Sequence, residues 1–265
     1  MTVRFLQDMK LFAGVVFVGT IAACSGDTTG ANLHPVKLSV TSSVLSAVTP
    51  TSAMRSSLAV GSASNFTITK VQLVMDKIEL NDGETTNCVG EIEATGDDHA
   101  QVGTECEDVS RDPVLVDIPV DGTLKTALNV PLAAGTYSKL EAKLEPARET
   151  ATAFNAANAT LVGKSVRVEG TYGSAATPFV FTSSVRAGLE MSFNPPLVID
   201  ATTTNATVSI DVSKWFLDSS NNVIDPSTAT PGSPALQTME DNIRRSFHAF
   251  EDDHESGIDD HRGHR

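Results

Sequence analysis

Short runs of alternating apolar and polar residues constrain this chain more than any other feature. Such runs occupy residues 71–75, 114–118, 140–144, 166–172 and 208–212, and Gly, Pro, Asn or Asp separates each run from the next. Alternation with a period of two places every second side chain on one face of a strand. Many short strands at this spacing predict a mainly β fold, either an antiparallel β-sandwich or an open barrel.

The first long apolar segment changes its phase of alternation twice between residues 66 and 80. A change of phase moves the apolar side chains to the other face unless a bulge compensates for it. We therefore predict one long strand interrupted by bulges, which ends at the turn residues Asn81, Asp82 and Gly83. The predicted β-sandwich domain covers residues 65–232.

One amphipathic helix is predicted near the C-terminus, over residues 233–250. Ser233 can cap it, and Pro234 suits its first position. Its predicted apolar face consists of Leu236, Met239, Ile243, Phe247 and Phe250. This face is expected to dock onto the sheet, and an acidic tail of residues 251–265 is expected to follow it.

The N-terminal residues read as an export signal. Arg4 and Lys10 come before an apolar stretch at residues 11–18 that is short for a membrane span, and the sequence Ile-Ala-Ala-Cys follows at residues 21–24. These four residues resemble the lipobox of bacterial lipoproteins. The resemblance implies a signal peptide of residues 1–23, lipid attachment at Cys24, and a place in the cell envelope with the membrane as partner. An ordinary secretory signal and an uncleaved anchor helix are the alternatives.

Residues 24–64 are expected to form a lipidated tether. They are rich in Ser, Thr and Ala, and their few large apolar residues gather at residues 36–40, where the sequence allows one strand. Ser25 and Gly26 follow the cysteine, where an Asp would resemble the inner-membrane retention signal of enteric bacteria. Outer-membrane placement is therefore favoured over the inner membrane.

Two further cysteines, Cys88 and Cys106, flank an acidic loop. In an oxidising compartment, with Cys24 occupied by lipid, they are expected to form a disulfide. The competing interpretation is a metal site that includes His99, although the spacing matches no familiar zinc pattern.

The net charge of −14 disfavours nucleic acid as a partner, because such a field repels phosphate backbones. The sequence contains no nucleophile elbow, phosphate loop or zinc-protease motif, and we predict no enzyme activity and no cofactor. The expected role is binding or structural, toward a small ligand, a glycan or another envelope protein.

Metal-ligand residue types gather in the C-terminal tail. The candidate ligands are Asp252, His254, Ser256, Asp259 and His261. Their spacing echoes the first half of a calcium loop, but His254 stands where a hard cation prefers oxygen, so zinc, copper or nickel would suit the set better. The alternative function is therefore a divalent-cation-binding envelope protein, and the competing interpretation is a solvated acidic terminus.

Three segments together resemble a family of bacterial lipoproteins that carry a β-sandwich domain of unknown function. These segments are residues 71–80, 116–118 and 131–140. The resemblance implies the fold and the envelope location. It implies no active-site residue, because the shared residues are structural.

Overall fold

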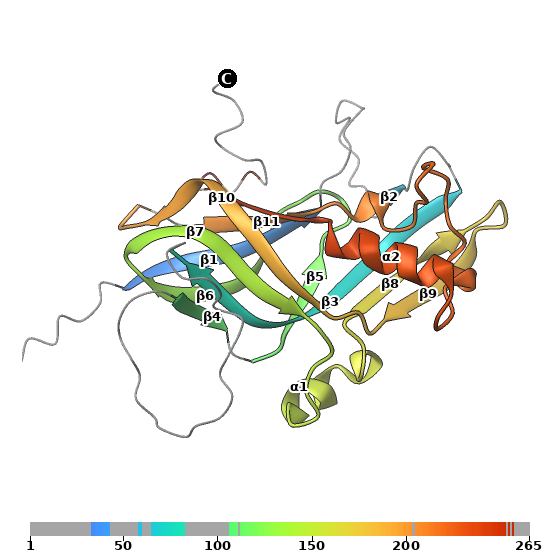
Figure 1. The fold of residues 1–265 in the computed structure, drawn as a ribbon, viewed down its shortest axis with the longest axis horizontal. Helices are drawn as coiled ribbons and strands as arrows, with labels where there is room; N and C mark the ends of the chain where they lie inside the picture. Colours follow the sequence, from blue (N-terminus) through green and yellow to red (C-terminus); the bar gives the residue numbers. More distant parts are fainter. Residues whose placement is uncertain are drawn as a thin grey trace, which may run out of the picture. The chain divides into compact units, whose positions relative to one another are not determined.

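The computed structural model describes residues 33–42, 58–59, 65–82, 106–110, 112–202, 205–252, 254 and 256. Two sheets and a few short helices make up this part of the chain (Figure 1). The strands are β1 (Leu33–Ser42), β2 (Leu58–Ala59), β3 (Phe66–Asn81), β4 (Cys106–Ser110), β5 (Val114–Ile118), β6 (Lys125–Ala133), β7 (Gly135–Leu144), β8 (Val166–Tyr172), β9 (Thr177–Ser183), β10 (Ala187–Ile199), β11 (Asn205–Ile210) and β12 (Phe247–Glu251). The helices are α1 (Thr152–Ala157) and α2 (Pro234–Arg244), with 3-10 turns at Ala159–Leu161, Val212–Lys214 and Pro226–Thr228.

The smaller sheet has the strand order β12-β11-β1-β6. β1 runs parallel to β11 and antiparallel to β6, so it lies inside the sheet and not at its edge. The larger sheet follows the path β10-β7-β3-β8-β9, and β2, β4 and β5 also pair with β3. β3 is thus the strand on which the larger sheet is built.

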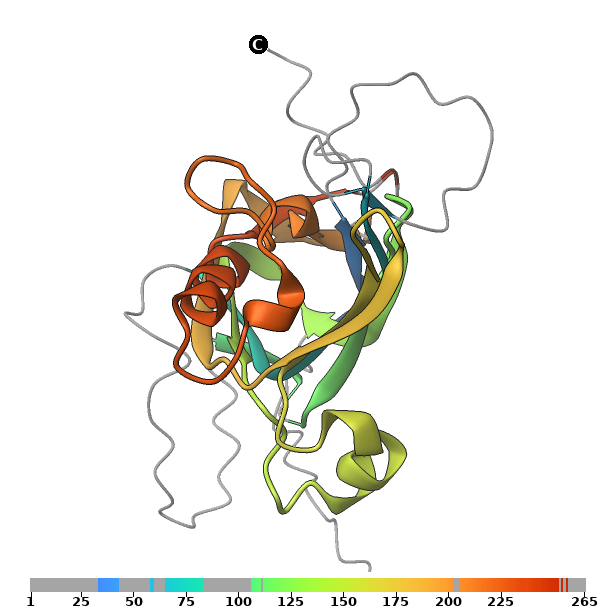
Figure 2. The same cartoon turned by 90° about the vertical axis from the view of Figure 1, so that its right-hand side faces the viewer.

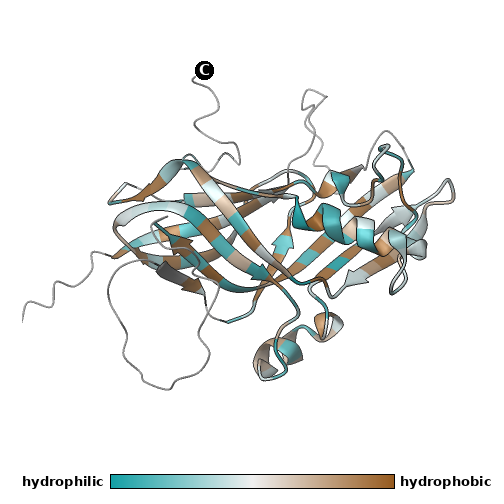
Figure 3. Cartoon of the chain, viewed as in Figure 1, coloured by the Kyte–Doolittle hydropathy of each residue, from teal (hydrophilic) through white to brown (hydrophobic). Residues whose placement is uncertain are grey.

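The core lies between the two sheets, which face each other in Figure 2. Along several strands apolar and polar residues alternate, as the colours of Figure 3 show, and the apolar residues form the core. This confirms the predicted mainly β fold, and a β-sandwich fits it. The predicted long strand is confirmed as β3, with register shifts next to Thr69 and Lys77. Lys77 adopts a φ of 52°, the left-handed conformation expected at a bulge.

Two parts of the predicted organisation are wrong. The strand that the sequence allowed at residues 36–40 exists as β1, but it is an interior strand of the smaller sheet and not part of a tether. The C-terminal helix ends at Arg244 and not at residue 250. Ser233 caps its start through a hydrogen bond from the Leu236 amide, as predicted, but Phe247 and Phe250 lie on β12, which pairs with β11.

A short helix, α1, lies in the connection between β7 and β8. It has six residues and buries none of them, so no apolar periodicity marks it in the sequence. Among the described residues, no helix has the length and hydropathy needed to cross a membrane.

Candidate functional site

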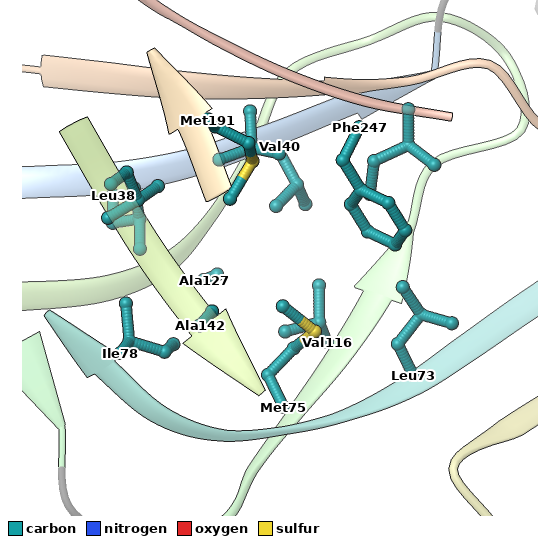
Figure 4. A pocket seen from close by; sticks show the side chains of 13 residues that line it. Leu38, Val40, Leu73, Met75, Ile78, Val116, Ala127, Ala142, Met191 and Phe247 are labelled. Carbon is teal, nitrogen blue, oxygen red and sulfur yellow. The ribbon is translucent and has the colours of Figure 1, made fainter. Parts of the chain in front are cut away.

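A small internal cavity lies between the two sheets (Figure 4). Its volume is about 30 Å³. Both sheets contribute to its wall, and every lining side chain is apolar: Leu38, Val40, Leu73, Met75, Ile78, Val116, Ala127, Leu140, Ala142, Met191, Val208, Ile210 and Phe247. The strand alternation explains this wall, since each of these residues belongs to the inward-facing set of its strand.

The chemistry available in this cavity is contact with apolar groups. An apolar cavity stays dry and takes up apolar molecules, because water would lose hydrogen bonds there. Two flexible side chains, Met75 and Met191, and two small ones, Ala127 and Ala142, form part of the wall. Methionine side chains are flexible and fill irregular gaps, which suits the uneven wall of this cavity.

A second feature is a set of buried carboxylates on the outer face of β3 and β7. Glu79 and Glu141 are direct cross-strand neighbours, and only 4% and 3% of their surfaces are exposed. Lys77 Nζ lies 3.6 Å from Glu79 Oε1, and Asn81 Nδ2 donates a hydrogen bond of 3.4 Å to Glu141 Oε1. Like charges directly opposite each other repel, so these cationic and amide neighbours are needed to hold the pair in place.

Asp76 lies on the same face and is 4% exposed. Arg148 Nε is 3.5 Å from its Oδ2, whereas its buried Oδ1 accepts no hydrogen bond from the described residues. Burial raises the pKa of this carboxyl group, and the Arg148 guanidinium offsets the increase only in part. Glu145 adds to the rise in the Asp76 pKa through charge repulsion.

This raised pKa predicts a distinct pH dependence. The folded protein holds the Asp76 proton more tightly than the unfolded chain, so this group's contribution to stability is fully present below pH 3.8 and is lost as pH rises through the native pKa. We expect Asp76→Asn to remove that loss and to flatten the unfolding free energy between pH 3.8 and neutrality. Urea unfolding across this range measures it.

Asp117 supplies the matched control. Burial alone would raise its pKa, but hydrogen bonds from Gln72 (2.8 Å) and Lys125 (3.2 Å) lower it overall. Asp117→Asn should therefore change the pH dependence in the opposite sense, since the Asp117 contribution is lost as pH falls. Two variants with the same slope as the parent would contradict the assignment.

Two of the predicted metal-ligating residues have another role. Asp252 is fully buried; its Oδ1 accepts hydrogen bonds from the backbone amide (2.8 Å) and the hydroxyl (3.1 Å) of Ser256, and its Oδ2 accepts one from Thr207 (3.1 Å). Asn205 donates to the Asp252 carbonyl and accepts from Ser39, at 3.1 and 2.6 Å. Asp252 and Ser256 thus form a turn bonded to the smaller sheet.

The structure does not bring the rest of the predicted metal set together. His254 is exposed, and Asp259 and His261 lie outside the described residues. Within the described ranges, no three His, Cys, Asp or Glu residues gather closely enough to hold a metal ion. Metal binding by the complete tail stays a prediction. Asp252 belongs to the fold. A truncated variant made to test metal binding by the tail must therefore keep all residues up to Ser256.

The predicted cysteine roles also remain predictions. Cys24 and Cys88 lie outside the described residues, and Cys106 is described only through its backbone, at the start of β4. His99, the third member of the competing metal interpretation, lies outside them as well.

Sequence reasoning missed the cavity and the buried polar residues. The alternation of the predicted strands indicates which apolar residues face inward, and some of these residues line the cavity. No local pattern marks Glu79 and Glu141 as neighbours, because the register between β3 and β7 decides that contact.

No family model matches the chain, and no curated protein matches it. One solved structure, MbnP from Methylosinus trichosporium, shares 12% sequence identity with it and aligns with a TM-score of 0.39, over 78% of this chain and 87% of that one.

Proposed function

We propose that this chain is a lipid-anchored protein of the bacterial cell envelope with a non-catalytic binding or structural role. The observation that carries the proposal is the position of the described fold relative to Cys24. β1 begins at Leu33, nine residues after this cysteine, and lies in the middle of the smaller sheet. The lipobox-like sequence therefore directly precedes the sheet domain, as an anchor should.

Acylation would hold the domain at the membrane firmly. One acyl chain gives only marginal binding, at about 0.8 kcal/mol for each buried CH₂ group, whereas two or three chains hold a protein stably. Ser25 and Gly26 favour the outer membrane over the inner one.

The cavity favours one kind of ligand among those the sequence allowed. A glycan needs hydrogen-bonding groups, whereas every side chain that lines this cavity is apolar. If the domain binds a small molecule in its interior, that molecule should be apolar. Another envelope protein as partner would bind elsewhere on the surface.

The test of the anchor is a single substitution. Cys24→Ser removes the thiol that would carry the lipid, and we expect the protein to move from the membrane fraction to the soluble fraction of expressing cells. Mass spectrometry of the parent protein should find an acylated N-terminal cysteine at residue 24. Ser25→Ala is the matched control and should stay in the membrane fraction. An unmodified N-terminus in the parent protein would refute the proposal.

A further inference from the structure

We infer that the end of the domain where β1 begins lies directly against the lipid surface. This inference rests on the proposed lipid anchor and adds which surface meets the bilayer. We call this surface the Leu33 end. It comprises Leu33, the turn Ala133–Gly135 between β6 and β7, and Val198 near the end of β10.

The strand registers bring these residues to one end. Leu33 of β1 pairs with Ala133, the last residue of β6, and Gly135, the first residue of β7, pairs with Ile199, the last residue of β10. The turn at Ala134 therefore joins the two sheets at this end. Figure 1 shows the start of β1, the β6–β7 turn and the end of β10 together at the left.

Chain length limits which part of the domain can face the membrane. Cys24 and Leu33 are nine Cα steps apart, and nine steps span at most about 30 Å. β3 alone has 16 residues, which corresponds to about 50 Å of strand. The linker is shorter than β3. It therefore keeps the Leu33 end close to the bilayer, whereas the far end of the domain, where β9 lies, can be farther away.

Exposed apolar side chains distinguish this end. Among the described residues, four large apolar side chains are well exposed: Leu33 (55%), Val162 (56%), Val180 (59%) and Val198 (46%). Leu33 and Val198 both belong to the Leu33 end, and Pro131 and Ala134 are exposed there too. Leu33 stands on the outer face of the smaller sheet and Val198 on that of the larger one, so an end-on approach brings both into the interface.

The charges near this end indicate which lipids suit it. Asp200 is exposed and accepts hydrogen bonds from the amide and hydroxyl of Thr202, and Lys139 pairs with Glu190. With a net charge of −14 on the whole chain, anionic headgroups repel the protein. Contact therefore depends on apolar burial in the headgroup region, and zwitterionic lipid is the appropriate probe.

Tryptophan fluorescence can test this placement, because the native chain has a single tryptophan, Trp215, which is fully buried. We would introduce Leu33→Trp and Val198→Trp separately into the full, acylated protein. Val180→Trp is the matched control, since Val180 is as exposed but lies on β9. Each protein is reconstituted into phosphatidylcholine vesicles with brominated acyl chains, which quench indoles at the bilayer.

We expect the brominated lipid to lower the emission intensity of the indoles at positions 33 and 198 by about twofold. The emission intensities of the indole at position 180 and of the native Trp215 should not change. If the protein is acylated but the indoles at positions 33 and 198 are quenched no more than the one at position 180, the inferred docking is wrong and the proposed lipid anchor stands. A protein that mass spectrometry shows to lack acyl chains overturns the anchor, and the docking with it.

Discussion

Gly170→Ala should prevent folding or lower the free energy of unfolding by more than about 3 kcal/mol. Gly170 lies inside β8, opposite Ile68 of β3, where the register of the two strands shifts. A Cβ atom at this position would lie 2.0 Å from the backbone oxygen of Thr67 and 2.9 Å from the ring of Phe179. The backbone oxygen cannot move without separating β3 from β8, so the larger sheet must distort around its main strand.

Gly188→Ala is the matched control for this variant. Gly188 is also in a strand, β10, but a Cβ atom there would meet nothing within 4 Å. We expect its unfolding free energy to stay within about 0.5 kcal/mol of the parent value. Urea denaturation followed by circular dichroism measures both variants. Equal stability of the two would show that β3 and β8 are not as close as described.

Phe216→Ala should lower the unfolding free energy by about 3–5 kcal/mol. Phe216 is fully buried, and its ring centroid lies 5.1 Å from that of Phe66, 5.4 Å from Phe181 and 5.8 Å from Phe179. Truncation removes these contacts and leaves a void where β3 and β9 meet the segment after β11. Aromatic pairs of this geometry add about 0.5–1.5 kcal/mol beyond the area that they bury.

Val180→Ala provides the comparison for this prediction. Val180 belongs to the same neighbourhood, on β9, but 59% of its surface is exposed. Its loss should change the unfolding free energy by less than about 0.5 kcal/mol. Calorimetry of both variants gives the two losses of unfolding free energy. Their difference separates the loss of core packing from a general effect on β9. A loss below about 1 kcal/mol for Phe216→Ala would mean that the aromatic cluster repacks.

The sequence predicted best the strands whose alternation is local. β5 and β8 have the bounds expected from their runs, at residues 114–118 and 166–172. β10 continues as one strand past Pro195 and Pro196, with a register shift between Ser192 and Leu197. Turn-forming residues therefore mark an irregularity in the strand, not its end.

Placements that depend on distant partners could not be found this way. A strand at residues 36–40 was allowed, but nothing in the sequence placed it inside the smaller sheet. β1 has a short apolar face, and its outward residue Ser39 is fully buried because it bonds Asn205 across the sheet. Phe247 fits a helical spacing from Leu236, yet it forms strand contacts because the Asp211 amide donates to the Ser246 carbonyl and brings the chain beside β11. The same pairing buries Asp252, which explains why a residue type typical of metal ligands serves the fold.

The parallel pairing of β1 with β11 has a consequence for export. On one side β1 pairs with β6, but on the other side residues 37–42 find their partners only at residues 205–210, so in an exported chain this strand must wait for one of the last strands to complete its pairing. Contacts so far apart in sequence form slowly, and the smaller sheet cannot close on a chain that is still in transit. If the chain is exported as we propose, the smaller sheet should therefore be completed only after translocation.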